Sequence, residues 1–147
     1  MSPQRTGMGG APVYKHILVP ISFDEEKKAD HALDVAQRLS AEGAQITLLH
    51  VMEEIPSYAI SYMPQDYLAE SRKAITTDLQ GRAATVSGGH AVVIDGHSGR
   101  TILDWAEANH VDLIVLASHR PGLQDYFLGG TAAQVVRHAH CSVHVVR

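Results

Sequence analysis

The chain alternates between short apolar runs and longer segments in which apolar residues recur every three or four positions. The short runs contain β-branched residues and end at proline, glycine or charged residues, which is typical of buried strands. This pattern predicts five strands, at residues 15–21, 45–52, 90–95, 112–117 and 142–146.

The longer segments have the period of amphipathic helices. In the first of them, Ala29, Ala32, Leu33, Ala36 and Leu39 share one face. Acidic residues at its start suit the positive end of a helix dipole. Helices are predicted at residues 24–41, 64–86, 100–109 and 129–138.

The alternation of strands with helices predicts the fold class. Strands that are apolar on both faces and separated by helices indicate a parallel sheet covered on both sides. Right-handed crossovers then give an α/β protein, a three-layer doubly wound sandwich. We expect one domain at residues 14–147, preceded by a flexible N-terminal tail at residues 1–13 that has no apolar signal-peptide core.

The connection at residues 53–63 has no clear period; it contains Pro56 and is followed by Pro64. It is more apolar than an ordinary exposed loop. Its apolar members are Ile55, Tyr58, Ile60, Tyr62 and Met63. Three interpretations stay open: a lid, a surface for a protein partner, or a segment that folds back onto the sheet.

Composition and charge narrow the class of partner. The 147 residues are 45% apolar and 19% charged, as in ordinary globular domains. A net charge of −4 gives no electrostatic reason to expect nucleic acid or an anionic membrane. No apolar run approaches the ~20 residues of a membrane span. The single Cys141 excludes an intramolecular disulfide and suits a reducing compartment, so we expect a cytoplasmic protein.

Doubly wound sheets bind ligands at the carboxyl ends of their strands, where the strand order reverses. Polar or glycine-rich segments stand at such ends in this chain. Residues 20–24 follow the first strand, residues 117–120 follow the fourth, and residues 129–131 open the last helix. If the first and fourth strands are neighbours, the three segments meet in one crevice.

The third segment has the chemistry of a phosphate cradle. Gly129 and Gly130 let backbone N–H groups approach an anion at a helix start, and Thr131 adds a hydroxyl. His119 and Arg120 offer side-chain donors to phosphate oxygens. The plainer alternative is that the glycines end a loop and Thr131 caps the helix. Neither the Walker pattern nor the Rossmann fingerprint is present.

Several stretches resemble the universal stress protein family over residues 14–147. They are the opening YKHILVPIS, the LLHV of the second strand and the closing ASHRP…YFLGG…VVRHAHCSVHVVR. Nucleotide-binding members of that family carry Gly-x2-Gly-x9-Gly-[Ser/Thr] after the fourth strand. Here Ala117 and Arg120 take the first two glycine positions, Gly129 takes the third, and Gly130 replaces the Ser/Thr. A literal nine-residue spacing would instead select Gly130 and Thr131. The Ala-Ser-His-Arg-Pro stretch is similar to a short, single-domain branch that includes ATP-binding members.

The resemblance implies ATP or a related adenine nucleotide, with Mg²⁺ as a possible companion. It would place Pro20, Ile21, Ser22 and Val51 around the base, Ala117, Ser118, His119 and Arg120 along the ribose and phosphates, and Gly129, Gly130, Thr131 and Ala132 under the phosphate chain. Ser22 stands where the family usually has Asp beside the adenine, so the carboxylate is missing.

The resemblance also implies a strand order and an assembly. The order is 3-2-1-4-5, that of the adenine nucleotide alpha hydrolase-like fold. The assembly is a homodimer through the last strand, Ser142 to Val146. That strand ends the sheet, and an apolar edge favours a partner on independent grounds.

Catalysis and metal binding are weaker interpretations. His138, His140, Cys141 and His144 cross a helix end into a strand, so their side chains should diverge, and we predict no metal site. Asp24, Asp125 and His119 could perform acid–base chemistry, but no nucleophile motif accompanies them, and we predict no catalytic residues.

The resemblance therefore implies a stress-response protein that binds ATP or a related adenine nucleotide as a conformational ligand and contacts a protein partner of unknown identity. One alternative is a nucleotide-independent dimeric interaction protein. Another is slow ATP hydrolysis or self-phosphorylation, with Thr131 or Ser118 as acceptor.

Overall fold

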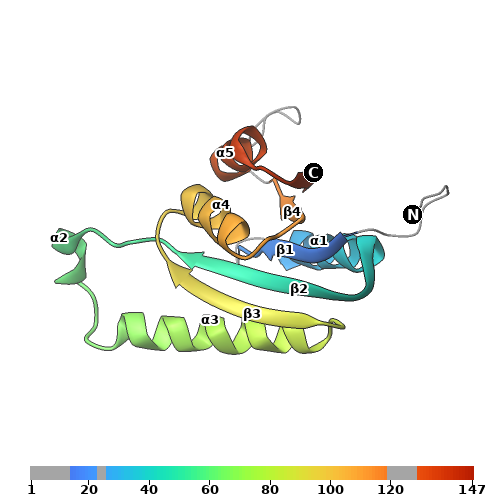
Figure 1. The fold of residues 1–147 in the computed structure, drawn as a ribbon. Coiled ribbons are helices and arrows are strands. Elements are labelled where there is room, and N and C mark those ends of the chain that lie inside the picture. Colours follow the sequence, from blue (N-terminus) through green and yellow to red (C-terminus); the bar gives the residue numbers. More distant parts are fainter. Residues whose placement is uncertain (1–13, 23–25, 119–128) are drawn as a thin grey trace, which may run out of the picture.

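A five-stranded parallel sheet forms the centre of the molecule (Figure 1). The computed structural model describes residues 14–22, 26–118 and 129–147, so the predicted N-terminal tail lies outside the described residues. The strands are β1 (Tyr14–Pro20), β2 (Ser40–Met52), β3 (Gly89–Asp95), β4 (Leu113–Ala117) and β5 (Ser142–Val146). Their order is β3-β2-β1-β4-β5, which confirms the predicted order and fold class.

Helices cover both faces of the sheet. They are α1 (Glu26–Leu39), α2 (Ser57–Ile60), α3 (Tyr67–Ala84), α4 (Ser98–Ala108) and α5 (Gly130–His138). Residues of α1 and α3 pack into the core on one face, and residues of α4 and α5 pack into the core on the other. Among the described helices none is long and apolar enough to cross a membrane.

The central strand β1 contributes side chains to both hydrophobic cores, because its side chains alternate between the two faces of the sheet. Ile17 and Val19 are fully buried against α1, while Leu18 is fully buried on the side of α4 and α5. Ala32 and Ala36 of α1 are small, which lets the helix lie close to the sheet. Burial of each large side chain stabilises the fold by about 1.5–3 kcal/mol.

The boundary between α1 and β2 differs from the sequence prediction. The helix ends at Leu39, and β2 begins at Ser40 rather than at residue 45. Tyr14 pairs with Ser40, whereas His16 pairs with Gln45, so β2 carries extra residues between the two pairs. Gly43, with φ of +77°, lies in this irregular part of the strand. The early pairing uses backbone groups and therefore leaves no apolar pattern in the sequence.

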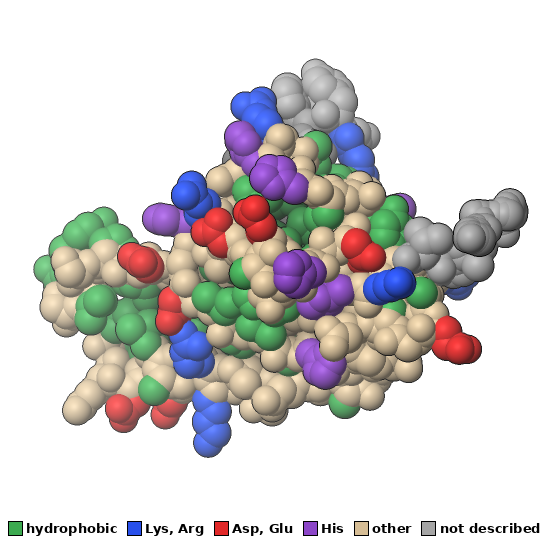
Figure 2. All heavy atoms as spheres, viewed as in Figure 1, with side chains coloured by type: hydrophobic (Ala, Val, Ile, Leu, Met, Phe, Trp, Pro, Cys, Tyr) green, Lys and Arg blue, Asp and Glu red, His purple; other side chains and the backbone are tan. Residues whose placement is uncertain are grey.

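The connection after β2 stands away from the sheet. We call residues 54–66 the arm; it contains the one-turn helix α2, which has no buried residue. Figure 1 shows α2 at the far left of the molecule, and Figure 2 shows hydrophobic side chains gathered there. Tyr58 is 75% exposed and Tyr62 is 88% exposed. The interpretation that this segment folds back onto the sheet is therefore wrong for these side chains.

Candidate functional site

A cavity of about 660 Å³ opens at the carboxyl ends of β1, β2 and β4. It lies where the chain order reverses, because β1 has β2 on one side and β4 on the other. Its lining residues are Pro20, Ile21, Ser22, Ala29, Leu49, His50, Val51, Met52, Glu53, Ser98, Ile102, Leu116, Ala117, Ser118, Gly129, Gly130, Thr131 and Ala132.

The sequence-predicted binding residues that the structure describes all line this cavity. They are Pro20, Ile21, Ser22, Val51, Ala117, Ser118, Gly129, Gly130, Thr131 and Ala132. The other two, His119 and Arg120, lie outside the described residues. The crevice expected between the first and fourth strands is thus present, with the start of α5 on its rim.

The start of α5 is tied to the end of β4. The backbone N–H of Gly129 donates to Oγ of Ser118 at 3.2 Å, and Ser118 is only 8% exposed. Gly129 is the N-cap residue, and within the described residues no side chain caps the helix. Among those residues, no heavy atom lies within 4 Å of the position that a Cβ on Gly130 would take. Gly129, Gly130 and Thr131 all line the cavity, so the start of α5, whose first N–H groups have no partner within the helix, borders it.

A cation stands beside this helix start. Lys28, in the first turn of α1, donates from Nζ to the carbonyl oxygen of Ser118 at 2.9 Å. The ammonium group and the α5 dipole both favour an anion at this end of the cavity. Sequence reasoning missed Lys28 because its partner is 90 residues away along the chain.

The segment after β1 is held by β2 through both backbone groups of Ile21. The N–H of Ile21 donates to the carbonyl of Leu49 at 2.8 Å. Nδ1 of His50 lies 2.8 Å from the Ile21 carbonyl oxygen, which can only accept, so the ring nitrogen donates. The apolar wall formed by Pro20 and Ile21 is therefore fixed in position. His50 belongs to the LLHV stretch noted in the sequence, but its role was not predicted.

A carboxylate forms the opposite rim. Oε1 of Glu53 accepts hydrogen bonds from the backbone N–H of Ser98 at 2.8 Å and from its hydroxyl at 2.6 Å. These bonds hold the pKa of Glu53 below its usual value, although partial burial acts in the opposite direction. The carboxylate is thus ionised at neutral pH and caps the start of α4. Both residues follow strand ends, which is the signal that could have found them.

The cavity thus combines three kinds of surface. Ile102 and Leu116, which are 2% and 3% exposed, give it an apolar floor. The α5 end offers positive charge and N–H donors, and the Glu53 end offers an acceptor. Such a cavity suits a molecule with a flat apolar part, hydroxyl groups and an anionic end.

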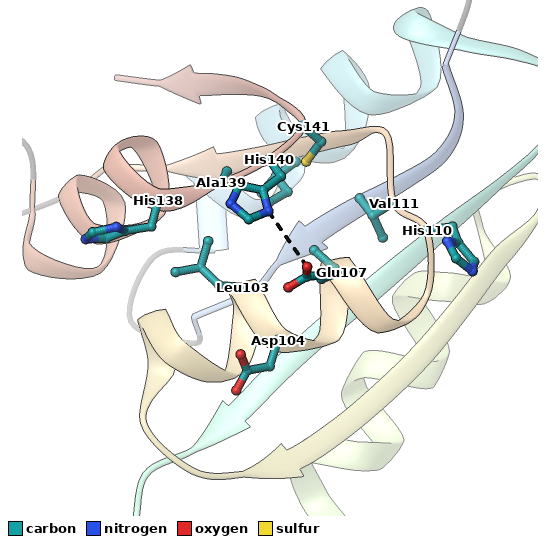
Figure 3. A pocket seen from close by; sticks show the side chains of 11 residues that line it. Leu103, Asp104, Glu107, His110, Val111, His138, Ala139, His140 and Cys141 are labelled. Atoms are coloured by element: carbon teal, nitrogen blue, oxygen red, sulfur yellow. Dashed lines mark ion pairs between the residues drawn. The ribbon is translucent and has the colours of Figure 1, made fainter.

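Of the residues weighed for acid–base catalysis or metal binding, none that the structure describes lines this cavity. Asp24, His119 and Asp125 lie outside the described residues. Elsewhere, His138, His140 and Cys141 line a second cavity of about 230 Å³ near the start of β5 (Figure 3). Figure 3 shows His140 directed at Glu107 and His138 directed away from it. The described residues contain no group of three side chains placed to hold a metal ion.

Fold and cavity together define a doubly wound α/β protein with a ligand-sized site at its switch point. The chain belongs to the universal stress protein family, whose model matches residues 13–147. It is 34% identical to universal stress protein A homolog 2 of Coxiella burnetii, over 91% of this chain and 95% of that one. It is 27% identical to universal stress protein G of Salmonella typhimurium, over 92% and 100% of the two chains.

Solved structures agree on the fold. Universal stress protein UspA from Lactobacillus plantarum is 28% identical with a TM-score of 0.65, over 91% of this chain and 98% of that one. A universal stress protein in complex with cAMP is 22% identical with a TM-score of 0.58, over 91% and 97%.

Proposed function

We propose that this protein binds an adenine nucleotide, ATP or a close relative, in the switch-point cavity as a conformational ligand in a stress response. The observation that carries the proposal is the start of α5 on the cavity rim, where no described side chain caps the helix and the Lys28 ammonium binds the carbonyl oxygen of the neighbouring Ser118. A phosphate chain is the anion that such a helix start accommodates. The family membership and the cAMP complex of a protein with the same fold also support it.

The nucleotide would lie along the cavity with its parts on different surfaces. The base packs against the fixed wall of Pro20, Ile21 and Val51, beside Ser22. Ribose and phosphates follow residues 117–120, and the phosphates reach residues 129–132, with Mg²⁺ as a companion ion. If a phosphoryl group is transferred to the protein itself, the exposed Thr131 is a better acceptor than the buried Ser118.

A second candidate is a nucleotide-independent interaction protein. The arm favours it, because Tyr58, Ile60 and Tyr62 are exposed large apolar side chains on a projecting segment. Clustered exposed apolar residues mark surfaces that bind other proteins. In this interpretation Ser22 replaces the family's Asp because adenine is not bound.

The assembly we propose is a cytoplasmic homodimer through β5. This strand pairs with β4 on one side and stands at the end of the sheet order. The same strand of a second copy, paired across the open edge, would satisfy its remaining backbone groups.

Thermal unfolding with millimolar ATP, with and without Mg²⁺, tests the nucleotide proposal. A ligand at ~100 times its dissociation constant stabilises the native state by roughly 2.7 kcal/mol. For a domain of this size the midpoint should rise by roughly 5–10 °C. The same measurement with GTP and with AMP shows whether the rise in midpoint depends on the base and on the number of phosphates.

Two glycine variants supply the matched comparison. Gly130→Val fills space on the cavity rim and should abolish the ATP shift. Gly81→Val, on the remote helix α3 and equally unobstructed among the described residues, should retain it. No shift of the parent protein with any nucleotide would favour the interaction protein instead.

A further inference from the structure

Two helices, α4 and α5, begin at the same cavity, and their starts differ in charge. Ser98 and Gly130, the first residues of these helices, both line it. The α4 start already holds the Glu53 carboxylate, whereas the α5 start stands beside Lys28. We propose that Glu53 is a specificity-determining residue: it excludes anions from the α4 end and so fixes the direction in which a phosphate-bearing ligand lies.

The position of Glu53 is set by the sheet rather than by chance contact. Met52, the last residue of β2, pairs with Asp95, the last residue of β3. The N–H of Gly96 then donates to the Met52 carbonyl at 3.0 Å, which keeps the two strand ends together. Glu53 follows Met52 directly, so its side chain reaches the helix that starts at Ser98.

The capping bonds neutralise the positive end of α4. A helix start carries roughly half of a positive charge, and an ionised carboxylate more than cancels it. Hydrogen bonds from Ser98 lower the pKa of Glu53, and the nearby His97 acts in the same direction. At neutral pH the α4 end of the cavity is therefore negative and repels phosphate.

The same carboxylate can accept from a neutral donor. Both hydrogen bonds from Ser98 end on Oε1, and within the described part of the chain Oε2 has no hydrogen-bond donor. A ribose hydroxyl or an amino group of a ligand could donate to it. The ligand class is thus a molecule with an anion at one end and uncharged hydrogen-bond donors at the other. This ligand class rests on the proposed nucleotide function, but the exclusion of anions from α4 does not.

Inorganic phosphate is the probe that tests the exclusion of anions from the α4 start separately from nucleotide binding. Backbone amide resonances of the full chain are followed by NMR during a phosphate titration. In the parent protein Gly130 and Thr131 should shift, while Ser98 and Gly99 stay within error. In Glu53→Ala, Ser98 and Gly99 should shift as well, with an apparent affinity at least tenfold above that of the parent.

The neighbouring carboxylate gives a matched control. Glu54 is exposed and one residue away, so Glu54→Ala removes the same charge from the chain without freeing α4 and should behave as the parent. If Glu53→Ala does not fold, Glu53→Gln keeps the acceptor without the charge, and Ser98 must then respond more than in the parent. Phosphate shifts at Ser98 in the parent, or none in either Glu53 variant, would overturn the proposal. Failure of ATP to bind the parent would count against the nucleotide function alone.

Discussion

At the scale of single residues, two glycines show that backbone conformation and surrounding space are separate constraints. Gly43 and Gly88 have φ of +77° and +73°, which side-chain-bearing residues rarely adopt. A Cβ on Gly43 would meet no described atom within 4 Å. A Cβ on Gly88 would lie 2.2 Å from the carbonyl oxygen of Ala44. Gly88 is therefore needed for close approach as well as for its turn.

Alanine at the two positions should have different effects on the free energy of unfolding. Gly43→Ala should cost about 1 kcal/mol, the price of the left-handed conformation. Gly88→Ala should cost about 3 kcal/mol or more, because backbone must also move. Denaturant unfolding of both variants measures the difference. Equal costs would mean that the contact with Ala44 relaxes freely.

At the scale of elements, α3 is a long helix with a small buried face. Of its residues, Leu79 and Ala83 are buried, and both lie in its second half. Arg82 links that half to α1 through an ion pair with Asp30 at 2.8 Å. The first half carries the exposed Leu68 and begins where the arm ends, and from there α3 runs back alongside β3 (Figure 1). The buried contacts of α3 therefore lie in its C-terminal half, whereas its first half reaches the sheet through an exposed ion pair of Arg72 with Asp95.

Truncation of two leucines on this helix tests the asymmetry. Leu79→Ala should lower the free energy of unfolding by about 2–4 kcal/mol, since its side chain is fully buried. Leu68→Ala, the same change at a site 38% exposed, should cost less than about 1 kcal/mol. Comparable losses at both positions would show that the first half of α3 is packed in solution.

The strands were predictable because each is an apolar run, and β5 has the predicted bounds, Ser142–Val146. The early part of β2 could not be predicted, because residues 40–45 are mostly polar and pair with β1 through their backbone groups. In the candidate site, Gly129 and Gly130 could be predicted from the local sequence, because two glycines directly before a helical pattern indicate a helix start. The Glu53–Ser98 pair joins residues 45 apart, and only the pairing of β2 with β3 brings them together.

At the scale of the whole molecule, the two edges of the sheet differ. The β3 edge lies next to α3, whereas β5 ends the sheet on the other side (Figure 1). The Val146 carbonyl accepts from the N–H of Ser118 at 2.9 Å, so its backbone faces β4. Because backbone direction alternates along a strand, the N–H of Val145 faces the open edge.

Proline at Val145 should therefore weaken the proposed dimer without breaking the ladder to β4. It removes an outward N–H and adds a ring that obstructs pairing. Val145→Ala, which shortens the same side chain and keeps the N–H, should remain dimeric. Sedimentation equilibrium of the three proteins distinguishes these outcomes. A monomeric parent would refute the dimer, and a dimeric proline variant would move its interface away from β5.

The arm begins next to a residue that lines the cavity. Glu53, whose carboxylate holds the start of α4, is the residue immediately before the arm. Tyr58 at the far end is exposed, while the near end is fastened to the cavity wall. The arm is therefore anchored at the wall of the candidate site, through the residue that precedes it. A change in the contact between Glu53 and Ser98 would therefore displace the arm at the point where it begins.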